Sequence, residues 1–303
     1  MSLYADLVSR HFGRTLGKAL LGLRVSRVGA TGPRAADKAY DAVIQAIGGV
    51  AASQRDPRTG EPVMLSTTVC DKLTALTAAQ AVTAALFARS RDGQGRRVEV
   101  AMLDATLAFQ WPDAMYNHVF LDEPPPPMPE FGATQRPWRT ADGFVATMVP
   151  QQAEFIGLCR AIGRPDIAQD PRFATQQARY RHGPALRELL EPWMASFDTA
   201  ALATACRAHG VPIGEVNERQ QVLDDARVQH NAMLLALPNG DAGRVRVARA
   251  AALFDGQPQQ PSTGAGRLGE HGREVLAELG CTDDQVARLL ADGVLRLPDP
   301  TSA

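Results

Sequence analysis

The chain has 303 residues, which is enough to bury a large hydrophobic core, and its length alone suggests two domains. Hydrophobic residues make up 45% of the chain and charged residues 21%, as is typical of a globular protein. The 32 basic residues almost balance the 33 acidic residues, so the net charge gives no indication of a nucleic acid or a membrane surface as partner.

Cysteine usage and the N-terminal segment bear on the compartment. The four cysteines, at positions 70, 159, 206 and 281, lie far apart and show no C-x-x-C spacing, so we expect neither a metal site nor disulfides. A reducing cytoplasm fits this usage best. No apolar stretch approaches the roughly 20 residues of a membrane span. The basic N-terminus lacks a sustained apolar core and a small-residue cleavage site, so a basic helical face is expected rather than a secretory signal.

The first part of the chain reads as a series of helices and turns. Leucines near helical spacing predict a helix over residues 3–23, and Gly29–Pro33 break it as a turn. A short helical run, Ala39–Ile47, ends at a glycine pair that is typical of a C-terminal stop. The polar segment Ser53–Pro62 is expected to be a loop. Cys70–Arg89 then predict a helix whose many small residues favour close packing against a sheet or another helix.

The segment around residue 104 is the most informative. The glycine-containing turn Asp92–Gly95 leads into a strand-like run, Arg97–Leu103, which passes directly into an amphipathic helical run, Ala105–Phe120. This is one pass of an α/β winding. Asp104 lies at the switch, where the carboxyl ends of strands place ligands and where a helix dipole keeps a carboxylate ionised. The alternative is that Asp104 serves only as the N-cap of the helix.

A proline run marks the next boundary. Pro124–Pro129 cannot form a helix or a central strand and favours an extended conformation, so it predicts a semi-rigid connector between domains. Arg139–Thr147 predict a turn followed by a strand, in which Asp142-Gly143 form the turn. The other expected features are helices at 151–162, 183–195 and 198–209, a second linker near Pro238–Gly240, a polar stretch at 256–266 and two short helices at 272–280 and 282–290.

Six short motifs occur in a fixed order along the chain. They are Gly29–Pro33 followed by Ala39–Asp41, Asp71–Lys72 at the start of the alanine-rich helix, Gly93–Gly95 with Val98–Ala105, Thr140–Gly143, Gly210–Asn217 and Leu268–His271. Together they resemble the family III CoA-transferases, the group that contains formyl-CoA transferase and carnitine CoA-transferase. Each motif is weak alone, and their common order carries the resemblance.

The resemblance implies an α/β fold with a Rossmann-like large domain and an inserted smaller α+β domain. We expect residues 1–128 to form the first part of the large domain, 129–237 the small domain with its linkers, and 238–303 a linker and the return to the large domain. The resemblance also implies an interlocked homodimer, with which the long proline-rich connector is consistent. The recognisable pattern starts only at Gly29, so we expect the chain to be short at its N-terminus relative to the family.

The nucleophilic aspartate of the family falls on Asp104, and this favours a catalytic role over capping alone. An ionised aspartate needs no general base to attack a thioester. The implied route gives an aspartyl–acyl anhydride and CoA thiolate, then an aspartyl-CoA thioester that an acceptor carboxylate attacks. The partners are therefore an acyl-CoA and a carboxylic acid, with no metal or redox cofactor. Backbone N–H groups near the helix start are the expected oxyanion donors.

Three further residues are candidates for contact with CoA. They are Gln45, Tyr40 and Asp71. For Gln45, a place on the pantetheine channel competes with a buried network role. We expect His118 to be structural and Glu270 to act at the N-terminus of a final helix.

Two alternatives remain open. The α-methylacyl-CoA racemases of the same superfamily use a histidine and an aspartate. Asp71 falls on that aspartate, but the histidine position matches Tyr40, a phenol of pKa about 10 that is a poor base at neutral pH. The other alternative is a non-catalytic, truncated CoA-binding paralogue, because residues 1–28 contain no glycine-rich phosphate-binding turn.

Overall fold

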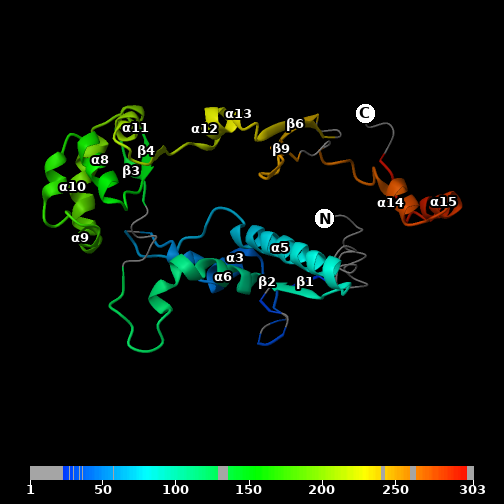
Figure 1. Cartoon of the computed structure of the whole chain (residues 1–303). Helices are drawn as coiled ribbons and strands as arrows, with labels where there is room; N and C mark the ends of the chain where they lie inside the picture. Colours follow the sequence, from blue (N-terminus) through cyan, green and yellow to red (C-terminus); the bar gives the residue numbers. More distant parts are fainter. Residues whose placement is uncertain are drawn as a thin grey trace. The chain divides into compact units, whose positions relative to one another are not determined.

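The computed structural model describes residues 23–26, 28–29, 31–33, 35, 37–56, 58–128, 136–239, 243–259 and 264–298 (Figure 1). The helix predicted at 3–23 lies outside these residues except at Leu23, where a strand begins. The described residues form a mixed α/β protein in two units, which meet in the sequence between Val216 and Asn217. The predicted domain boundaries at residues 128 and 237 stay predictions. None of the helices that the structure describes combines the length and the hydropathy of a membrane span.

The first unit opens with a parallel strand pair. β1 (Leu23–Ser26) pairs with β2 (Val98–Ala101), with Leu23 opposite Val98. Two strands are all that the described residues show of the predicted Rossmann-like sheet, so its full winding stays a prediction. The helical elements around this pair are α3 (Asp41–Ile47), α4 (Val50–Ser53), α5 (Val69–Asp92), α6 (Met102–Ala114) and the 3-10 turn η1 (Tyr116–His118).

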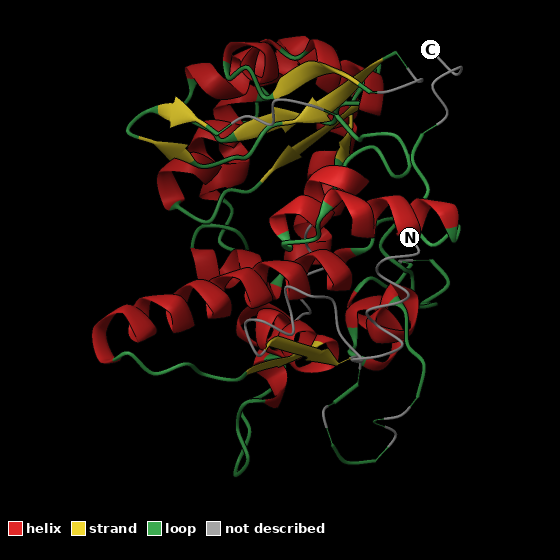
Figure 2. Ribbon diagram, turned by 90° about the vertical axis from the view of Figure 1, so that its right-hand side faces the viewer, coloured by secondary structure: helices red, strands yellow, loops and turns green. Residues whose placement is uncertain are grey.

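Helix α5 confirms the predicted alanine-rich helix and runs beside β2 and α6, which Figure 1 labels; Figure 2 shows the same helices and strands after a 90° turn. Its buried residues Cys70, Thr74 and Ala78 recur every four residues and so share one face. Ala78 packs against Val100 of β2 and Ala105 of α6. The helix ends at Gly93, whose φ of 72° is a left-handed conformation that glycine adopts without strain.

The predicted switch from strand to helix is present, but the helix begins earlier than expected. α6 starts at Met102, so Ala101 is the N-cap and Asp104 is the third helical residue. The N-cap interpretation of Asp104 is therefore wrong. Met102 and Leu103 are unbranched at Cβ and fit a helix as readily as a strand, which hid the boundary in the sequence. α6 also ends at Ala114, before the predicted Phe120, and it contains Pro112, whose missing N–H removes one backbone hydrogen bond to the preceding turn.

Residues 138–216 hold the largest hydrophobic core. Strands β3 (Trp138–Arg139), β4 (Phe144–Thr147) and β5 (Ile213–Glu215) form an antiparallel sheet in the order β3-β4-β5. The helical elements packed with it are α8 (Gln152–Ala161), η2 (Pro165–Gln169), α9 (Gln176–Arg181), α10 (Gly183–Ala195) and α11 (Thr199–Ala208). Of these, α8, α10 and α11 confirm the three predicted helices. Fully buried members of this core include Val145, Phe155, Phe173, Met194, Leu202 and Cys206.

The predicted turn at Asp142 also fixes the start of α11. Asp142 accepts hydrogen bonds from the backbone N–H of Thr199 at 2.8 Å and from its hydroxyl at 2.6 Å. These bonds, the hydroxyl first, hold the pKa of Asp142 below its usual value. The motif Thr140–Gly143 therefore ties the β3–β4 turn to the first turn of α11.

Arg179 on α9 is a buried cation within this core. The residue is 7% exposed, and its guanidinium carbon lies 4.4 Å from the ring centroid of Phe155. One terminal nitrogen donates to Gln152 at 2.7 Å and to the carbonyl of Phe173 at 3.1 Å. The other, Nη2, has no hydrogen-bond partner among the described residues. Burial lowers the pKa of Arg179 from its usual value.

Replacing Arg179 tests what this buried charge contributes. Arg179→Met removes the unpaired donor while a flexible apolar chain of similar length fills the space, so we expect the free energy of unfolding to stay within about 1 kcal/mol of wild type or to rise. Arg179→Ala leaves a cavity and is expected to cost about 2–4 kcal/mol. Urea unfolding of both variants measures this. A Met variant as unstable as the Ala variant would show that the charge itself stabilises the fold.

The second unit contains short helices and hairpins. Its elements are α12 (Arg219–Asp224), α13 (Ala226–His230), β6 (Leu234–Pro238), β7 (Arg244–Ala248), β8 (Leu253–Phe254), β9 (Gln257–Pro258), α14 (Gly272–Glu278) and α15 (Asp283–Ala291). The last two confirm the predicted terminal helices. The second linker predicted near Pro238 is instead the end of a hairpin strand, because β6 pairs with β7 along its whole length.

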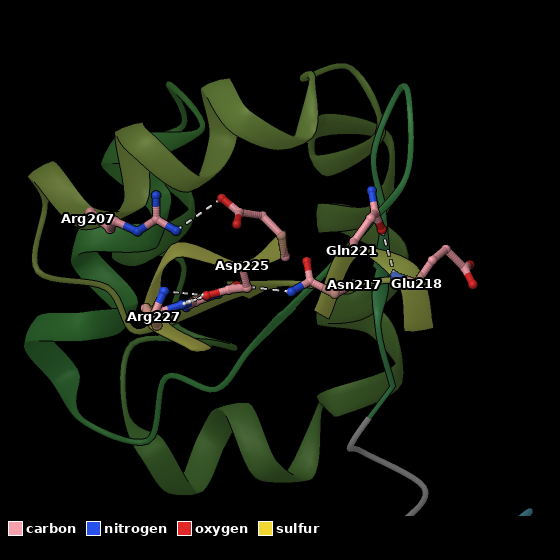
Figure 3. A network of polar contacts seen from close by, with 7 residues as sticks. Arg207, Asn217, Glu218, Gln221, Asp225 and Arg227 are labelled. Atoms are coloured by element: carbon pink, nitrogen blue, oxygen red, sulfur yellow. Dashed lines mark hydrogen bonds and ion pairs between the residues drawn. The ribbon is translucent and has the colours of Figure 1, made fainter. Parts of the chain in front are cut away.

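Two motif segments of the resemblance have structural roles. In Gly210–Asn217, Glu215 of β5 pairs with Arg207 of α11 at 3.1 Å, and the amide of Asn217 donates to Asp225 at 3.2 Å (Figure 3). Asp225 also accepts from the Arg227 side chain, which holds its pKa well below the usual range. In Leu268–His271, Glu270 accepts from the backbone of Arg267 at 2.6 Å, so it braces the turn just before α14.

Candidate active site

Asp104 is exposed in the first turn of α6. Strand β2 ends at the residue before this helix, so the carboxylate lies at the carboxyl end of a parallel strand and at the positive end of a helix dipole. Ala101 provides no side-chain cap for the first-turn N–H groups. Within the described part of the chain, no hydrogen bond or ion pair engages the Asp104 carboxylate. Its oxygens are thus available to a ligand.

A buried polar network joins α3 to the start of α5. Asp41 is 6% exposed and accepts hydrogen bonds from the backbone N–H groups of Cys70 at 2.7 Å and Asp71 at 3.1 Å. Gln45 is 2% exposed and donates to Asp41 and to the carbonyl of Thr67 at 3.2 Å, while its oxygen accepts from the N–H of Leu65 at 2.9 Å. The network role that the sequence left open for Gln45 is therefore present. Its contact with CoA stays a prediction.

The hydrogen-bond network connects the segments that carry Tyr40, Gln45 and Asp71, and Asp104 is not part of it. Tyr40 is the exposed N-cap residue of α3, directly before Asp41, and Asp71 lies in the exposed first turn of α5 that Asp41 holds. Asp104 shares no described hydrogen bond with this group. The described hydrogen-bond partners at the start of α5 include no histidine, which the racemase alternative requires. His118 lies in η1 on the surface.

Two residues of this region, Asp41 and Lys72, have contacts that the sequence pattern does not predict. The buried carboxylate of Asp41 bonds to backbone groups 29 and 30 positions away, a contact that no local pattern reveals. Lys72 is exposed on the first turn of α5, and its Nζ donates to the hydroxyl of Thr67 at 2.6 Å. A signal did exist for Lys72, because it is one of only three lysines among 32 basic residues. Arginine supplies nearly all the positive charge elsewhere.

A cavity of about 200 Å³ lies between the α4–α5 segment and α6. On α6 it is lined by Thr106, Phe109, Gln110 and Asp113, which share one face of the helix. Asp104 precedes Thr106 by two residues, which places it about 200° around the helix from Thr106. The cavity therefore opens on the face of α6 opposite the carboxylate. Among the described residues, no cluster of three His, Cys, Asp or Glu side chains is arranged to hold a metal ion.

Comparisons with known proteins agree on one family. The chain matches the sequence model of CoA-transferase family III over residues 14–272. It is 29% identical to succinate–glutarate CoA-transferase of Agrobacterium fabrum over 269 residues, 88% of this chain and 67% of the relative. It is 31% identical to formyl-CoA:oxalate CoA-transferase of Streptomyces avermitilis over 285 residues, 87% of this chain and 69% of the relative.

Solved structures give the same result. The crystal structure of Rv3272 from Mycobacterium tuberculosis superimposes with a TM-score of 0.69 at 27% sequence identity, covering 83% of this chain and 67% of that one. A CAIB/BAIF family protein from Brucella suis superimposes with a TM-score of 0.68 at 26% identity, covering 85% of this chain and 67% of the other. The chain thus spans about two thirds of the length of the relatives it matches.

Proposed function

The chain belongs to CoA-transferase family III, and we propose that it moves CoA from an acyl-CoA donor to a carboxylic acid acceptor through covalent intermediates on Asp104. One observation carries the assignment of the nucleophile. Asp104 is an exposed carboxylate in the first turn of a helix that begins directly at the end of a parallel strand, and no described side chain engages it.

The reaction passes through two kinds of covalent intermediate on this carboxylate, an anhydride and a CoA thioester. An Asp104 oxygen attacks the thioester carbon, the C–S bond breaks, and the products are an aspartyl–acyl anhydride and CoA thiolate. The thiolate then attacks the aspartyl carbonyl, which releases the donor acid and leaves an aspartyl-CoA thioester. The acceptor carboxylate attacks this thioester, the C–S bond breaks, and an aspartyl–acceptor anhydride and free thiolate form. The thiolate then attacks the acceptor carbonyl, which gives the new acyl-CoA and releases the Asp104 carboxylate. Each step exchanges one acyl bond for another, so no net proton, oxidant or reductant is required.

The two helix starts differ in what they offer to a developing oxyanion. At the start of α5, the Asp41 carboxylate already accepts the N–H groups of Cys70 and Asp71. At the start of α6, no side chain caps the helix. Backbone N–H groups at an uncapped helix start favour negative charge. We therefore propose the first-turn amides of α6, beside Asp104, as donors to the tetrahedral oxyanions.

At the start of α5 two backbone N–H groups already donate to Asp41, so side chains are the groups left to contact the CoA moiety. The ammonium of the exposed Lys72 can pair with a phosphate as a point charge. Asp71 precedes it on α5, and Tyr40 is exposed at the start of α3. We propose that Tyr40, Asp71 and Lys72 contact CoA and that Gln45 contributes from below the surface.

The relatives' names suggest which acids to test. Two of them are named for succinate with glutarate and for formyl-CoA with oxalate, so we propose small mono- and dicarboxylic acids as the substrate class. Incubating the chain with succinyl-CoA, glutaryl-CoA or a branched acyl-CoA and a second, isotope-labelled acid is expected to yield a new labelled thioester by mass spectrometry. Labelled product without a matching loss of donor would be inconsistent with transfer. Binding of CoA with no transfer across the panel would instead support a non-catalytic CoA-binding protein.

Two further properties complete the proposal. We propose an interlocked homodimer, supported by the large apolar side chains exposed in the first unit, such as Leu76 and Phe87 on α5 and Phe109 on α6. Sedimentation of the chain at micromolar concentration measures this assembly. We also propose a cytoplasmic location, supported by four free cysteines, three of which are buried.

A further inference from the structure

The segment between α4 and α5 has an irregular backbone, which side chains of α3 hold through hydrogen bonds. Residues 65–68 belong to no helix or strand, yet their backbone groups are engaged by α3. Gln45 accepts from the N–H of Leu65 and donates to the carbonyl of Thr67. Asp41 continues this contact into the first turn of α5, where Thr68 makes no side-chain cap. Two buried side chains, one helical turn apart on α3, thus define the path of residues 65–71.

Lys72 lies in the first turn of α5, a position that is unfavourable for a cation unless a negative charge is nearby. A cation near a helix N-terminus is disfavoured by the helix dipole. The buried Asp41 carboxylate offsets this because it lies at the same helix start and accepts two of its N–H groups. The Lys72 ammonium also donates to the hydroxyl of Thr67. The carbonyl of Thr67 in turn accepts a hydrogen bond from the Gln45 amide. The orientation of the exposed ammonium therefore depends on the buried pair.

We infer that Asp41 and Gln45 are positioning residues for the acyl-CoA site, which they serve by fixing residues 65–72 and with them the exposed side chains of Asp71 and Lys72. This inference rests on the proposed function. It assigns to Gln45 an indirect role: its amide is already occupied by backbone groups and by Asp41, so it acts through the segment it holds.

The test replaces one buried glutamine and compares it with another. Gln45→Met keeps the volume and removes the hydrogen bonds to residues 65 and 67. We expect the dissociation constant for CoA, measured by calorimetric titration of the full chain, to rise about tenfold, which is about 1.4 kcal/mol. We expect KM for acyl-CoA to rise in parallel while kcat changes less than about twofold. Hydrogen exchange of residues 63–72 is expected to be faster than in wild type.

The matched control is Gln110→Met. Gln110 is also a buried glutamine, 7% exposed, but it donates to the carbonyl of Gly48 at 2.8 Å and shares no described hydrogen bond with residues 65–72. Its CoA affinity is expected to match wild type. A second variant, Thr67→Val, lies on the surface and releases the Lys72 ammonium. It is expected to weaken CoA binding about threefold, and it keeps the test valid if Gln45→Met does not fold.

Each outcome decides the matter. Weaker CoA binding in Gln45→Met and Thr67→Val, with Gln110→Met unchanged, supports the positioning role. Wild-type affinity in the folded Gln45→Met variant, or an equal loss in Gln110→Met, overturns it while leaving the proposed function intact. If Gln45→Met does not fold, wild-type affinity in Thr67→Val overturns it. Absence of CoA binding by the wild-type chain itself would overturn both.

Discussion

Asp104→Asn is expected to reduce CoA transfer by at least about a thousandfold, the scale of loss when a covalent nucleophile is removed. An amide oxygen does not attack a thioester at a useful rate, and no described neighbour offers a substitute carboxylate at the start of α6. Stability is expected to change by less than about 1 kcal/mol, because the side chain is exposed, makes no described contact and loses only its interaction with the helix dipole.

Trapping distinguishes the loss of the nucleophile from the loss of substrate binding. Incubation with acyl-CoA and hydroxylamine is expected to modify wild-type Asp104, as detected by peptide mass spectrometry, and to leave the Asn variant unlabelled. Asp113→Asn is the matched control, since Asp113 is an exposed carboxylate near the other end of the same helix. It is expected to retain transfer. Robust turnover by Asp104→Asn, or labelling elsewhere in the wild-type chain, would refute the assignment of the nucleophile.

Local pattern was sufficient where the structure depends on neighbouring residues. The glycine stop after α3, the alanine-rich α5, the strand before residue 104 and the helices at 151–162, 183–195 and 198–209 all follow from periodicity and from glycine or proline placement. The start of α6 did not, because Met102 and Leu103 suit both strand and helix. Helix boundaries depend on tertiary contacts that a local pattern does not contain.

The same distinction between local pattern and tertiary contact applies to the residues of the candidate site. The succession of a strand, an acidic residue and a helix predicts where Asp104 lies, and only the family resemblance predicts its catalytic role, which stays a prediction. Asp41 was not given a role, because its function as a cap depends on a helix start 29 residues further along the chain. For Gln45 the sequence left a buried network and a ligand contact open, and only the fold shows which backbone groups occupy its amide. Long-range capping of this kind is invisible to the usual search for a cap adjacent to its helix.

Gly157→Ala is expected to destabilise the chain by about 2–3 kcal/mol, although alanine is the better helix former by about 1 kcal/mol. Gly157 is buried in α8. A Cβ atom there would lie 2.5 Å from the carbonyl oxygen of His209 and 3.0 Å from a methyl group of Val211. The backbone at this contact cannot yield easily, since the N–H groups of His209 and Val211 both donate to the carbonyl of Cys206. The substitution must therefore push α8 away from the end of α11 and disturb the core of residues 138–216.

Urea unfolding with far-UV circular dichroism measures this change in the full chain. Gly183→Ala is the matched control, because Gly183 begins α10 in the same core region and a Cβ there meets no atom within 4 Å. It is expected to leave stability unchanged or to raise it by about 0.5–1 kcal/mol by restricting the unfolded chain. If Gly157→Ala unfolds at the same urea concentration as Gly183→Ala, α8 and α11 separate at little cost, and the close approach at Gly157 does not determine how these helices pack.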